Sequence, residues 1–338
     1  MKDTDTLKDN DPIDAVICWV DGDDPLHQQK MAPFLKNEKR SSIPGAHPTR
    51  FASVNEIKYC VLSVLTYAPF LRNIYIVTDD QDPGVHNEVK KYFPERVDSV
   101  KVVDHKEIFR GYEKNLPIFS SRAIESLIWR IDGLSDNFIY LNDDLFLIRE
   151  TRKQDFFVDN SPVLRGSWCY DQYFRLLWKK LQKALHSYLL GNKNFKSRSS
   201  FHLVQWKAAY YMGMKWKYFY MDHTPHPLNR ETAEIFFNKH KNILEKNLKH
   251  RFKNHHQFNF ISLLYHYELL HGNTNIMPPD LAYLQPFNRS EKYLERKFSY
   301  CRQNNEIRFL CIQSMELCNK EQQKIIFDWL DNNLNSNP

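Results

Sequence analysis

The chain has 338 residues, and its 47 Lys and Arg against 41 Asp and Glu leave a formal net charge of +6. This length can bury a substantial core, and the modest basic excess is compatible with a phosphate-rich or anionic partner without indicating nucleic-acid binding. Glycine is scarce at nine residues. Neither a GxGxxG fingerprint nor a P-loop motif occurs, which argues against dinucleotide-binding enzymes and P-loop NTPases.

The six cysteines are scattered without a CxxC pair. This pattern predicts reduced core thiols in a cytoplasmic protein, not a disulfide scaffold or a zinc site. Residues 1–12 are polar and acidic, so we expect a disordered lead-in and not a signal peptide. No apolar run approaches the length that spans a bilayer. Any membrane association is therefore expected to be peripheral, at the inner face of the cell membrane.

The first predicted strand covers Ile13–Val20, a short apolar run rich in β-forming residues. It ends at Asp21, where a turn with three carboxylates begins. Asp21 follows the strand directly and is the best functional candidate of the three, because the other two are ordinary turn residues. The polar residues 26–52 predict a loop that could form a lid over the site.

Residues Ser53–Tyr67 predict an amphipathic helix, followed by strands at Asn73–Thr78 and Val100–Val103. The first residue of this helix and Glu56 have the spacing of a capping box, which gives Glu56 a structural explanation of its own. The second strand, like the first, ends in carboxylates that begin with Asp79.

A second helix is predicted to begin at Ser121, its expected N-cap, and to end near residue 133. Glu125 lies beside the apolar stripe of this helix. Partial burial fits that position, although a solvated glutamate is the default for a helix surface.

The strand Phe138–Leu147 follows and contains Asn142-Asp143-Asp144. One interpretation is a polar turn between two strands, because Asn and Asp are common turn residues. The other is a metal or acid/base site, because two adjacent carboxylates repel each other unless a cation or a proton offsets their charge.

The alternation of strands and helices over residues 13–150 predicts an α/β fold, with a Rossmann-like, mainly parallel sheet and helices on both of its faces. Carboxylates follow three of the strands, and in a parallel sheet these strand ends share one edge. Acidic residues that meet there without a glycine-rich loop suggest Mg²⁺ or another divalent cation that bridges to a diphosphate.

Beyond residue 150 the pattern of residue types in the sequence changes. Residues 151–280 predict a mainly helical second region, and residues 281–338 predict a segment with one strand and a final amphipathic helix that packs back on the core. Residues Trp168–Tyr220 alternate aromatic and basic side chains. That pattern fits a surface for an anionic membrane or a saccharide acceptor, and equally helices that bury their aromatic residues.

The segment around His226 is distinctive because prolines flank this histidine on both sides and fix its backbone. A histidine held rigidly in a loop is a candidate general acid or base, since its unperturbed pKa lies near neutrality. A structural histidine bonded to a carbonyl is the alternative. A zinc site formed by His223 and His226 is a weaker possibility, because no HExxH motif or further ligand set accompanies it.

Several motifs occur in a fixed order over about residues 13–318. They are DAVICWVDG (14–22), RF (50–51), NEIKY (55–59), YAP (67–69), NIYIVTD (73–79), LPIFSSRAIE (116–125), FIYLNDD (138–144), PHP (225–227) and Arg251. This set resembles the Stealth family of sugar-phosphate transferases, which includes bacterial capsular polysaccharide phosphotransferases and the catalytic subunit of the animal lysosomal-enzyme N-acetylglucosamine phosphotransferase. One departure stands out: Gln313-Ser314 occupies the place where the family usually has Asn-Asp, so Glu316 could take over that aspartate's role.

The resemblance implies an enzyme that moves a hexose or N-acetylhexosamine 1-phosphate from a UDP-sugar to an acceptor sugar hydroxyl, releasing UMP. The acceptor would be an oligosaccharide or a lipid-linked polysaccharide, other capsule-assembly proteins are conceivable partners, and nucleic acid is not expected. Residues 13–150 would bind the nucleotide sugar, and residues 151–280 would supply acceptor and catalytic groups. Catalysis would fall to Asp143 and Asp144 (also the metal ligands), His226 and Arg251, with Arg251 clamping a phosphate oxygen. Substrate-binding positions would be Asp21, Arg50, Asn55, Glu56, Asp79, Ser121, Glu125 and Asn142.

Two other functions fit the same residues. A conventional metal-dependent glycosyltransferase would release UDP in place of UMP, with residues 21–23 as its DxD candidate. An acceptor-binding scaffold that has lost activity is the second alternative, and the Gln313-Ser314 departure makes it conceivable.

Overall fold

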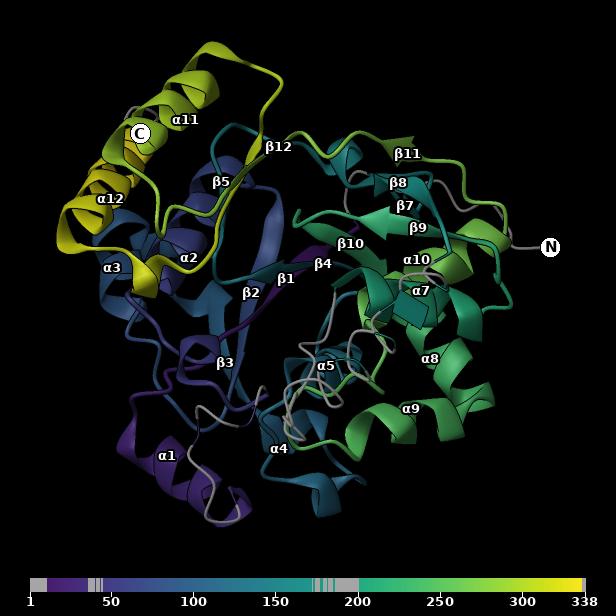
Figure 1. Cartoon of the computed structure of the whole chain (residues 1–338). Coiled ribbons are helices and arrows are strands. Elements are labelled where there is room, and N and C mark those ends of the chain that lie inside the picture. The colour runs from purple at the N-terminus through teal and green to yellow at the C-terminus, as the bar shows by residue number, and fades with distance from the viewer. Residues whose placement is uncertain are drawn as a thin grey trace.

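The computed structural model describes residues 11–335, apart from 36–39, 41–42, 44, 172, 174–176, 179–180, 182–184 and 186–200. The predicted disordered lead-in therefore lies almost wholly outside the described residues. A five-stranded sheet forms the centre of the molecule (Figure 1), in the order β10-β4-β1-β2-β3. Its strands are β1 (Ile13–Cys18), β2 (Leu71–Thr78), β3 (Val100–Asp104), β4 (Asn137–Asn142) and β10 (His226–Asn229).

Strands β4, β1, β2 and β3 are mutually parallel, whereas β10 runs antiparallel along β4. The three central strands consist largely of buried apolar residues because helices and loops cover both of their faces. Pro227 is tolerated in β10 because this strand forms the edge of the sheet, where a missing N–H leaves no neighbour unpaired.

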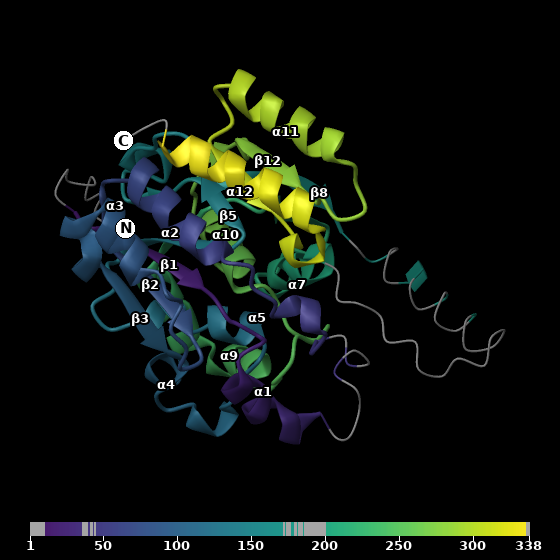
Figure 2. The ribbon, with the colours of Figure 1, turned by 90° about the vertical axis from the view of Figure 1, so that its left-hand side faces the viewer.

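One face of the sheet is covered by a layer that combines helices from the first third of the chain with its last two helices. Ile17 and Ile76 pack into this layer, and Figure 2 shows α12 and α2 side by side in it. The layer contains α2 (Glu56–Tyr67), α3 (His86–Tyr92), α11 (Glu291–Gln303), α12 (Lys320–Asn335) and a small sheet of β12 (Leu281–Leu284), β13 (Phe309–Ile312) and β5 (Leu145–Leu147).

The opposite face packs against helices that come mostly from later in the chain. Val16, Val77 and Tyr140 point into this second core. The covering helices are α4 (His105–Ile108), α5 (Ser121–Glu125), α7 (Phe201–Tyr211), α8 (Arg230–Lys239), α9 (Lys241–Leu248) and α10 (Phe260–Leu270). The predicted α/β class, with a mainly parallel sheet between helical layers, is confirmed.

Residues 151–280 contain strands that the sequence pattern did not predict. A three-stranded sheet has the order β11-β8-β9, and β6 and β7 form a small hairpin. These strands are β6 (Phe157–Val158), β7 (Ser161–Pro162), β8 (Leu164–Tyr170), β9 (Lys217–Met221) and β11 (Ile276–Met277). These strands lie in a region whose pattern suggested mainly helices, and β10 lies where the pattern suggested a loop, so pairing with strands distant in sequence decided their structure.

Three local predictions were wrong in detail. The expected loop at 26–52 contains helix α1 (Pro25–Met31), whose N-cap Asp24 accepts hydrogen bonds from two backbone N–H groups. Helix α2 begins at Glu56, three residues later than predicted, because Asn55 adopts a left-handed conformation with φ of 71°. Ser120, not Ser121, is the N-cap of α5, and that helix ends at Glu125 before a 3-10 turn.

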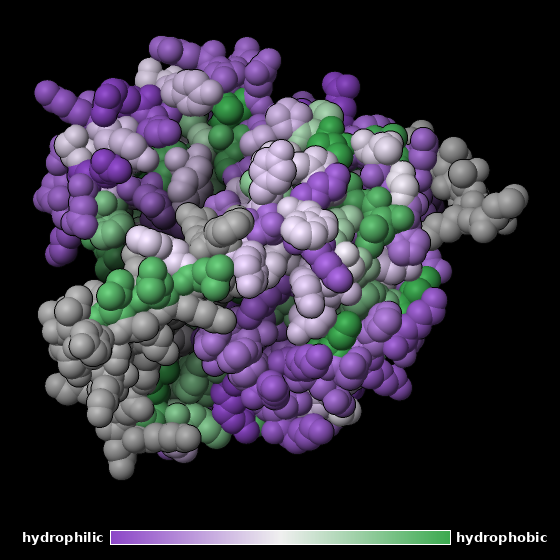
Figure 3. Space-filling view, turned by 45° about the vertical axis from the view of Figure 1, so that its right-hand side comes forward, coloured by the Kyte–Doolittle hydropathy of each residue, from purple (hydrophilic) through white to green (hydrophobic). Residues whose placement is uncertain are grey.

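Hydrophilic residues cover most of the face shown in Figure 3, and hydrophobic ones surface only in small groups. Within the described part of the chain, no helix combines the length and the apolar character needed to cross a bilayer. All six cysteines are free, and four of them are buried, in line with the predicted core thiols.

Candidate active site

A cavity of about 660 Å³ lies at the edge of the central sheet where the parallel strands end. Cys18 ends β1 and Asn142 ends β4, so both reach the cavity from strand termini. Eight of the predicted site residues line it: Arg50, Glu56, Ser121, Glu125, Asn142, Asp143, Asp144 and His226. The inference that strand ends meet at one ligand-binding edge thus agrees with the observed geometry.

The carboxylates of Glu56, Asp143 and Asp144 are close enough to influence one another's ionisation. Burial, reinforced by the charge of Glu56, raises the pKa of Asp144 to about 7. The same causes, with Asp144 as a further neighbour, raise the pKa of Asp143 well above its usual value. One carboxylate oxygen of Asp144, Oδ1, is buried without a hydrogen-bond partner among the described residues. This group of acids therefore favours a bound proton or a cation.

The capping box predicted for Ser53 and Glu56 does not form, because α2 begins at Glu56 itself with Asn55 as its N-cap. Glu56 nevertheless accepts hydrogen bonds at this turn. Its Oε2 accepts hydrogen bonds from the backbone N–H of Val54 at 2.5 Å and from the hydroxyl of Ser53 at 3.4 Å. Burial still raises the pKa of Glu56. Glu56 thus closes the entry to helix α2 and also contributes negative charge to the cavity.

The donor set at this edge suits a hard cation such as Mg²⁺ in chemical type, because it offers carboxylate oxygens, one of them unpaired. Among the described residues, however, no group of three or more His, Cys, Asp or Glu side chains is arranged to hold a metal. Mg²⁺ is commonly bound through one or two carboxylates, with substrate phosphates and water completing its shell. Asp143 and Asp144 fit that mode, and a metal at this pair stays a prediction.

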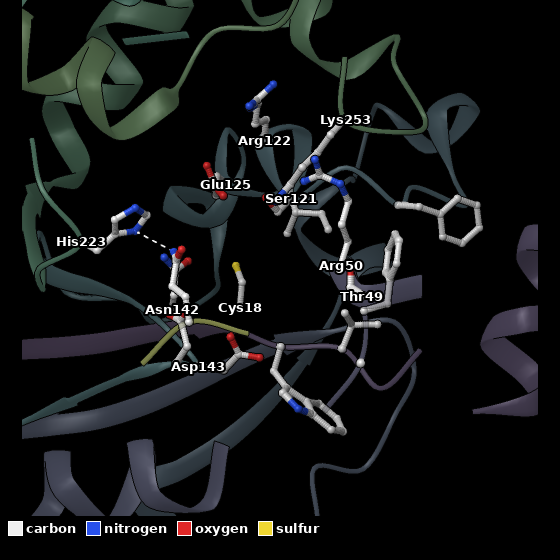
Figure 4. Close-up of a pocket in the computed structure, with 18 of the residues that line it drawn as sticks. Cys18, Thr49, Arg50, Ser121, Arg122, Glu125, Asn142, Asp143, His223 and Lys253 are labelled. Atoms are coloured by element: carbon white, nitrogen blue, oxygen red, sulfur yellow. Dashed lines mark hydrogen bonds between the residues drawn. The ribbon is translucent and has the colours of Figure 1, made fainter. Parts of the chain in front are cut away.

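Three basic side chains, Arg50, Arg122 and Lys253, line the same cavity (Figure 4). Burial, together with the charge of Arg50, lowers the pKa of Lys253 to about 8. The Lys253 ammonium forms no ion pair with any residue in the described part of the chain. Burial also lowers the pKa of Arg122 to about 10, and its Nη1 donates to the carbonyl of Asn254 at 3.0 Å.

Lys253 and Arg122 were not singled out from the sequence. Arg122 lies inside the LPIFSSRAIE motif, where its neighbours Ser121 and Glu125 drew attention, and Lys253 is two residues from Arg251. Gly45 allows the approach of the segment that carries Lys253, because a Cβ there would meet the Lys253 carbonyl at 2.6 Å. Only the packed structure reveals this contact.

Arg251 does not line the cavity, in contrast to its predicted role as a phosphate clamp. Its Nη1 donates to the carbonyls of Asn115 at 3.1 Å and Pro117 at 2.6 Å, and its guanidinium lies 4.2 Å from the ring centroid of Phe34. The Arg251 carbonyl accepts from the N–H of Phe119. Arg251 therefore fastens the segment that leads into α5, and guanidinium is suited to this because it presents several donors in a fixed plane.

Three other predicted binding residues also lie outside the cavity lining. Asp21 shapes its own turn, since its carboxylate accepts from the N–H of Asp23 at 2.9 Å. Asn55 is exposed in its left-handed conformation. Asp79 is buried beneath the wall, where it contacts the Nδ1 atom of His27 and the ammonium of Lys30, each at 3.1 Å.

Asp79 supports the cavity indirectly, because His27 and His105 are themselves lining residues. Burial by itself raises the pKa of the Asp79 carboxyl, but the hydrogen bond with His27 and the charges of His105 and Lys30 lower it to about 2. Asp79 is thus ionised and orients a wall of the cavity without facing a ligand.

His226 lies in β10, buried, with its Nδ1 3.2 Å from the phenol oxygen of Tyr265. Burial lowers the pKa of His226 to about 3, so the ring is neutral at pH 7. His223 lines the cavity close by, and burial lowers its pKa to about 4. The two histidines of this segment thus reach the cavity as neutral rings.

Comparison of the sequence with known protein families identifies two conserved regions in this chain. Residues 11–39 match Stealth protein CR1, conserved region 1, and residues 50–163 match Stealth protein CR2, conserved region 2. The chain belongs to the Stealth family. The resemblance inferred from its motifs is confirmed, and the matched regions contain the Asn142-Asp143-Asp144 turn, Arg50 and α5, but not the His226 segment.

Stealth relatives with similar sequences carry phosphotransferase names. The chain is 33% identical over 279 residues to an exopolysaccharide phosphotransferase of Streptomyces coelicolor, covering 80% of this chain and 41% of the relative. It is 29% identical over 257 residues to a capsular polysaccharide phosphotransferase of Actinobacillus pleuropneumoniae, covering 75% and 64%. A receptor polysaccharide phosphotransferase of Streptococcus oralis is 28% identical over 285 residues, with coverage of 80% and 82%.

The chain spans less than two thirds of the length of the first of these relatives. Among solved structures, the galactosyltransferase LgtC in complex with donor and acceptor sugar analogues aligns with a TM-score of 0.38 at 10% identity, covering 94% of this chain and 95% of that one.

Proposed function

We propose that this Stealth protein transfers a sugar 1-phosphate from a UDP-sugar to a hydroxyl of an acceptor saccharide, releasing UMP and forming a phosphodiester. The observation that carries this proposal is that Asp143 and Asp144 line one cavity at the sheet edge together with the cations Arg50, Arg122 and Lys253. The phosphotransferase names of the relatives support the reaction type.

The cations would bind the diphosphate of the donor. Arginine and lysine pair with phosphate oxygens through charge-assisted hydrogen bonds, which are the stronger kind. Lys253 lacks an ion-pair partner among the described residues, so a phosphate would supply the counter-charge and raise its depressed pKa.

The transfer itself joins the acceptor oxygen to the phosphorus that carries the sugar and breaks the bond from that phosphorus to the bridging oxygen. That oxygen leaves as part of UMP. The proton of the acceptor hydroxyl passes to a base, and Asp144 suits this role because its pKa of about 7 leaves it partly ionised at neutral pH. A divalent cation held by Asp143 would supply positive charge to phosphate oxygens, which leaves Asp144 to take the proton.

His226 is proposed to stand beside the reacting groups as a neutral imidazole, oriented by Tyr265. A neutral ring can accept or donate a proton at one nitrogen while the other keeps its hydrogen bond. This role is distinct from that of Asp144, so the two substitutions His226→Ala and Asp144→Asn separate them.

The decisive experiment incubates the purified chain with a UDP-sugar, Mg²⁺ and an oligosaccharide from the host's surface polysaccharide. Release of UMP with a new phosphodiester signal in the phosphorus NMR spectrum is the expected result. Release of UDP would replace the proposal by a conventional glycosyltransferase. If no product forms, and Asp144→Asn and His226→Ala leave polysaccharide assembly intact in the host, the protein acts as a scaffold.

A further inference from the structure

Gln313 stands beside the cavity at the end of β13, one residue beyond the last strand pairing. Its N–H donates to the carbonyl of Leu284 at 2.9 Å, and the preceding N–H, from Ile312, donates to the carbonyl of Asp144 at 3.0 Å. These two backbone bonds tie the position of Gln313 to the acidic turn. The side chain of Gln313 then reaches His223, which lines the cavity.

The hydrogen bonds around the Gln313 amide determine which way round it lies. Its Oε1 accepts from the phenol of Tyr283 at 2.6 Å and from Nε2 of Gln285 at 3.3 Å. Gln285 also donates to the Tyr283 oxygen at 2.7 Å, which directs the phenol hydrogen toward Gln313. If the Gln313 amide were reversed, its NH₂ group would face the NH₂ group of Gln285, and two donors would meet. The Gln313 oxygen therefore faces Tyr283 and Gln285.

With its oxygen engaged in this way, the Gln313 amide turns its NH₂ group toward Nδ1 of His223, at 3.4 Å. A nitrogen that accepts a hydrogen bond carries no proton, so a neutral His223 ring has its N–H on Nε2. The ring itself is held between two aromatic neighbours, at centroid distances of 4.7 Å from Phe201 and 5.4 Å from Tyr283, both nearly parallel to it.

We propose that Gln313 is a positioning residue that fixes the Nε2–H tautomer of His223, so that His223 offers a hydrogen-bond donor to an oxygen of the acceptor saccharide. In Figure 4, His223 lies beside Asn142 at one side of the cavity, and Arg50 lies at the other. The cationic side suits the diphosphate of the donor, which leaves the His223 side, with its stack of rings, for an uncharged sugar. The tautomer follows from the hydrogen bonds alone, whereas the role toward the acceptor rests on the proposed function.

Three substitutions test the arrangement. Gln313→Glu replaces the amide donor by a carboxylate, which can only accept from His223, and should move the ring proton to Nδ1. Tyr283→Phe keeps the stacked ring but removes the hydroxyl that orients the amide, and should give a mixture of tautomers. Gln303→Glu makes the same chemical change at an exposed residue at the end of α11 and serves as the matched control.

The tautomer is read from long-range nitrogen–proton correlation spectra of the whole chain with ¹⁵N-labelled histidine, and loss of one signal in His223→Asn assigns the ring. We expect the Nε2–H form in the unaltered protein and in the control. A wild-type ring protonated on Nδ1, or an unchanged tautomer in Gln313→Glu, overturns the proposal. If Gln313→Glu fails to fold, Tyr283→Phe decides.

The role toward the acceptor is tested with an oligosaccharide fragment of the host's surface polysaccharide. Gln313→Glu should raise the acceptor KM about tenfold, the scale of one hydrogen bond, and leave the KM of the UDP-sugar within about twofold. A switched tautomer with an unchanged acceptor KM overturns this part. If the unaltered chain releases no UMP, the proposed function fails on its own, and saturation-transfer NMR with the same oligosaccharide still measures acceptor binding.

Discussion

The two aspartates of the cavity come from the edge of the central sheet, whereas its cations come from a loop, a 3-10 turn and one short helix that only packing brings to that edge. Asp143 and Asp144 directly follow β4. Arg50 ends a 3-10 turn, Arg122 lies in α5, and Lys253 follows α9 in a loop. The two aspartates repel each other, and the charge of Arg50 likewise opposes that of Lys253.

The fold therefore holds the two kinds of charged group in place by different means. Asp143 and Asp144 form the turn between strands β4 and β5, and the Asp144 carbonyl accepts from the N–H of Ile312, so paired strands hold the two repelling carboxylates in a rigid frame. The cations depend on contacts such as those of Arg251 and Gly45, so their positions are set by tertiary packing. Substitutions of the aspartates and of the cations should therefore have different effects on catalysis, ligand binding and stability.

The largest effect is expected on the carboxylate side. Asp144→Asn should lower the rate of UMP release by about 10³-fold, within the range assigned to general acid–base catalysis. The same change removes one buried negative charge, so the melting temperature should rise by about 2 °C or more. Steady-state kinetics and calorimetry measure both. Asp328→Asn, on the exposed face of α12, is the control, and retained activity in Asp144→Asn would contradict the assigned role.

On the cationic side, Lys253→Met should weaken the binding of UDP about 10- to 100-fold, because one buried charge-assisted hydrogen bond is lost. Isothermal titration calorimetry gives the dissociation constant. Lys249→Met, at an exposed position of the same segment, should bind UDP as the unaltered chain does. Equal binding by the two variants would place the diphosphate elsewhere.

The two sides also differ in pH dependence. The pKa of Asp144 rises from 3.8 to about 7 on folding, so the folded chain binds the extra proton between these values. Its contribution to stability is complete below about pH 4 and is lost as the pH rises through 7. The stability of the unaltered chain should therefore fall more steeply from pH 5 to 8 than that of Asp144→Asn.

Urea unfolding of the unaltered chain and of Asp144→Asn, in the presence of a chelator, measures how the free energy of unfolding of each changes with pH. Taking the difference removes the opposite contribution of the buried histidines, whose lowered pKa values are common to both proteins. Parallel curves for the two proteins would show that Asp144 does not bind the extra proton.

The smallest effect on ligand binding is expected at Arg251. Arg251→Met should lower the free energy of unfolding by about 2 kcal/mol, since two carbonyls lose a charged donor. The folded variant should bind UDP within about threefold of the unaltered affinity, the scale of a small packing change. Urea unfolding and calorimetry check the two statements. A loss of UDP binding larger than that of Lys253→Met would restore Arg251 as a phosphate clamp.

Much of the fold could be predicted because it depends on local patterns. The apolar strands β1, β2 and β4 and their polar ends are continuous in the sequence, and parallel pairing alone places those ends together. The acidic half of the site follows from that rule. Strand β10 could not be foreseen, because its four residues owe their extended form to pairing with β4.

The sequence by itself thus determined the α/β core, the Asn142-Asp143-Asp144 turn and the family, because strand periodicity and ordered motifs are properties of neighbouring residues. Only the tertiary structure decided that Lys253 enters the cavity while Arg251 binds carbonyls outside it, although the two are separated by one residue. The physical reason is that a side chain's partner depends on which segments pack against it. That packing depends on which surfaces are buried across the whole chain, so it cannot be read from the spacing of neighbouring residues in the sequence.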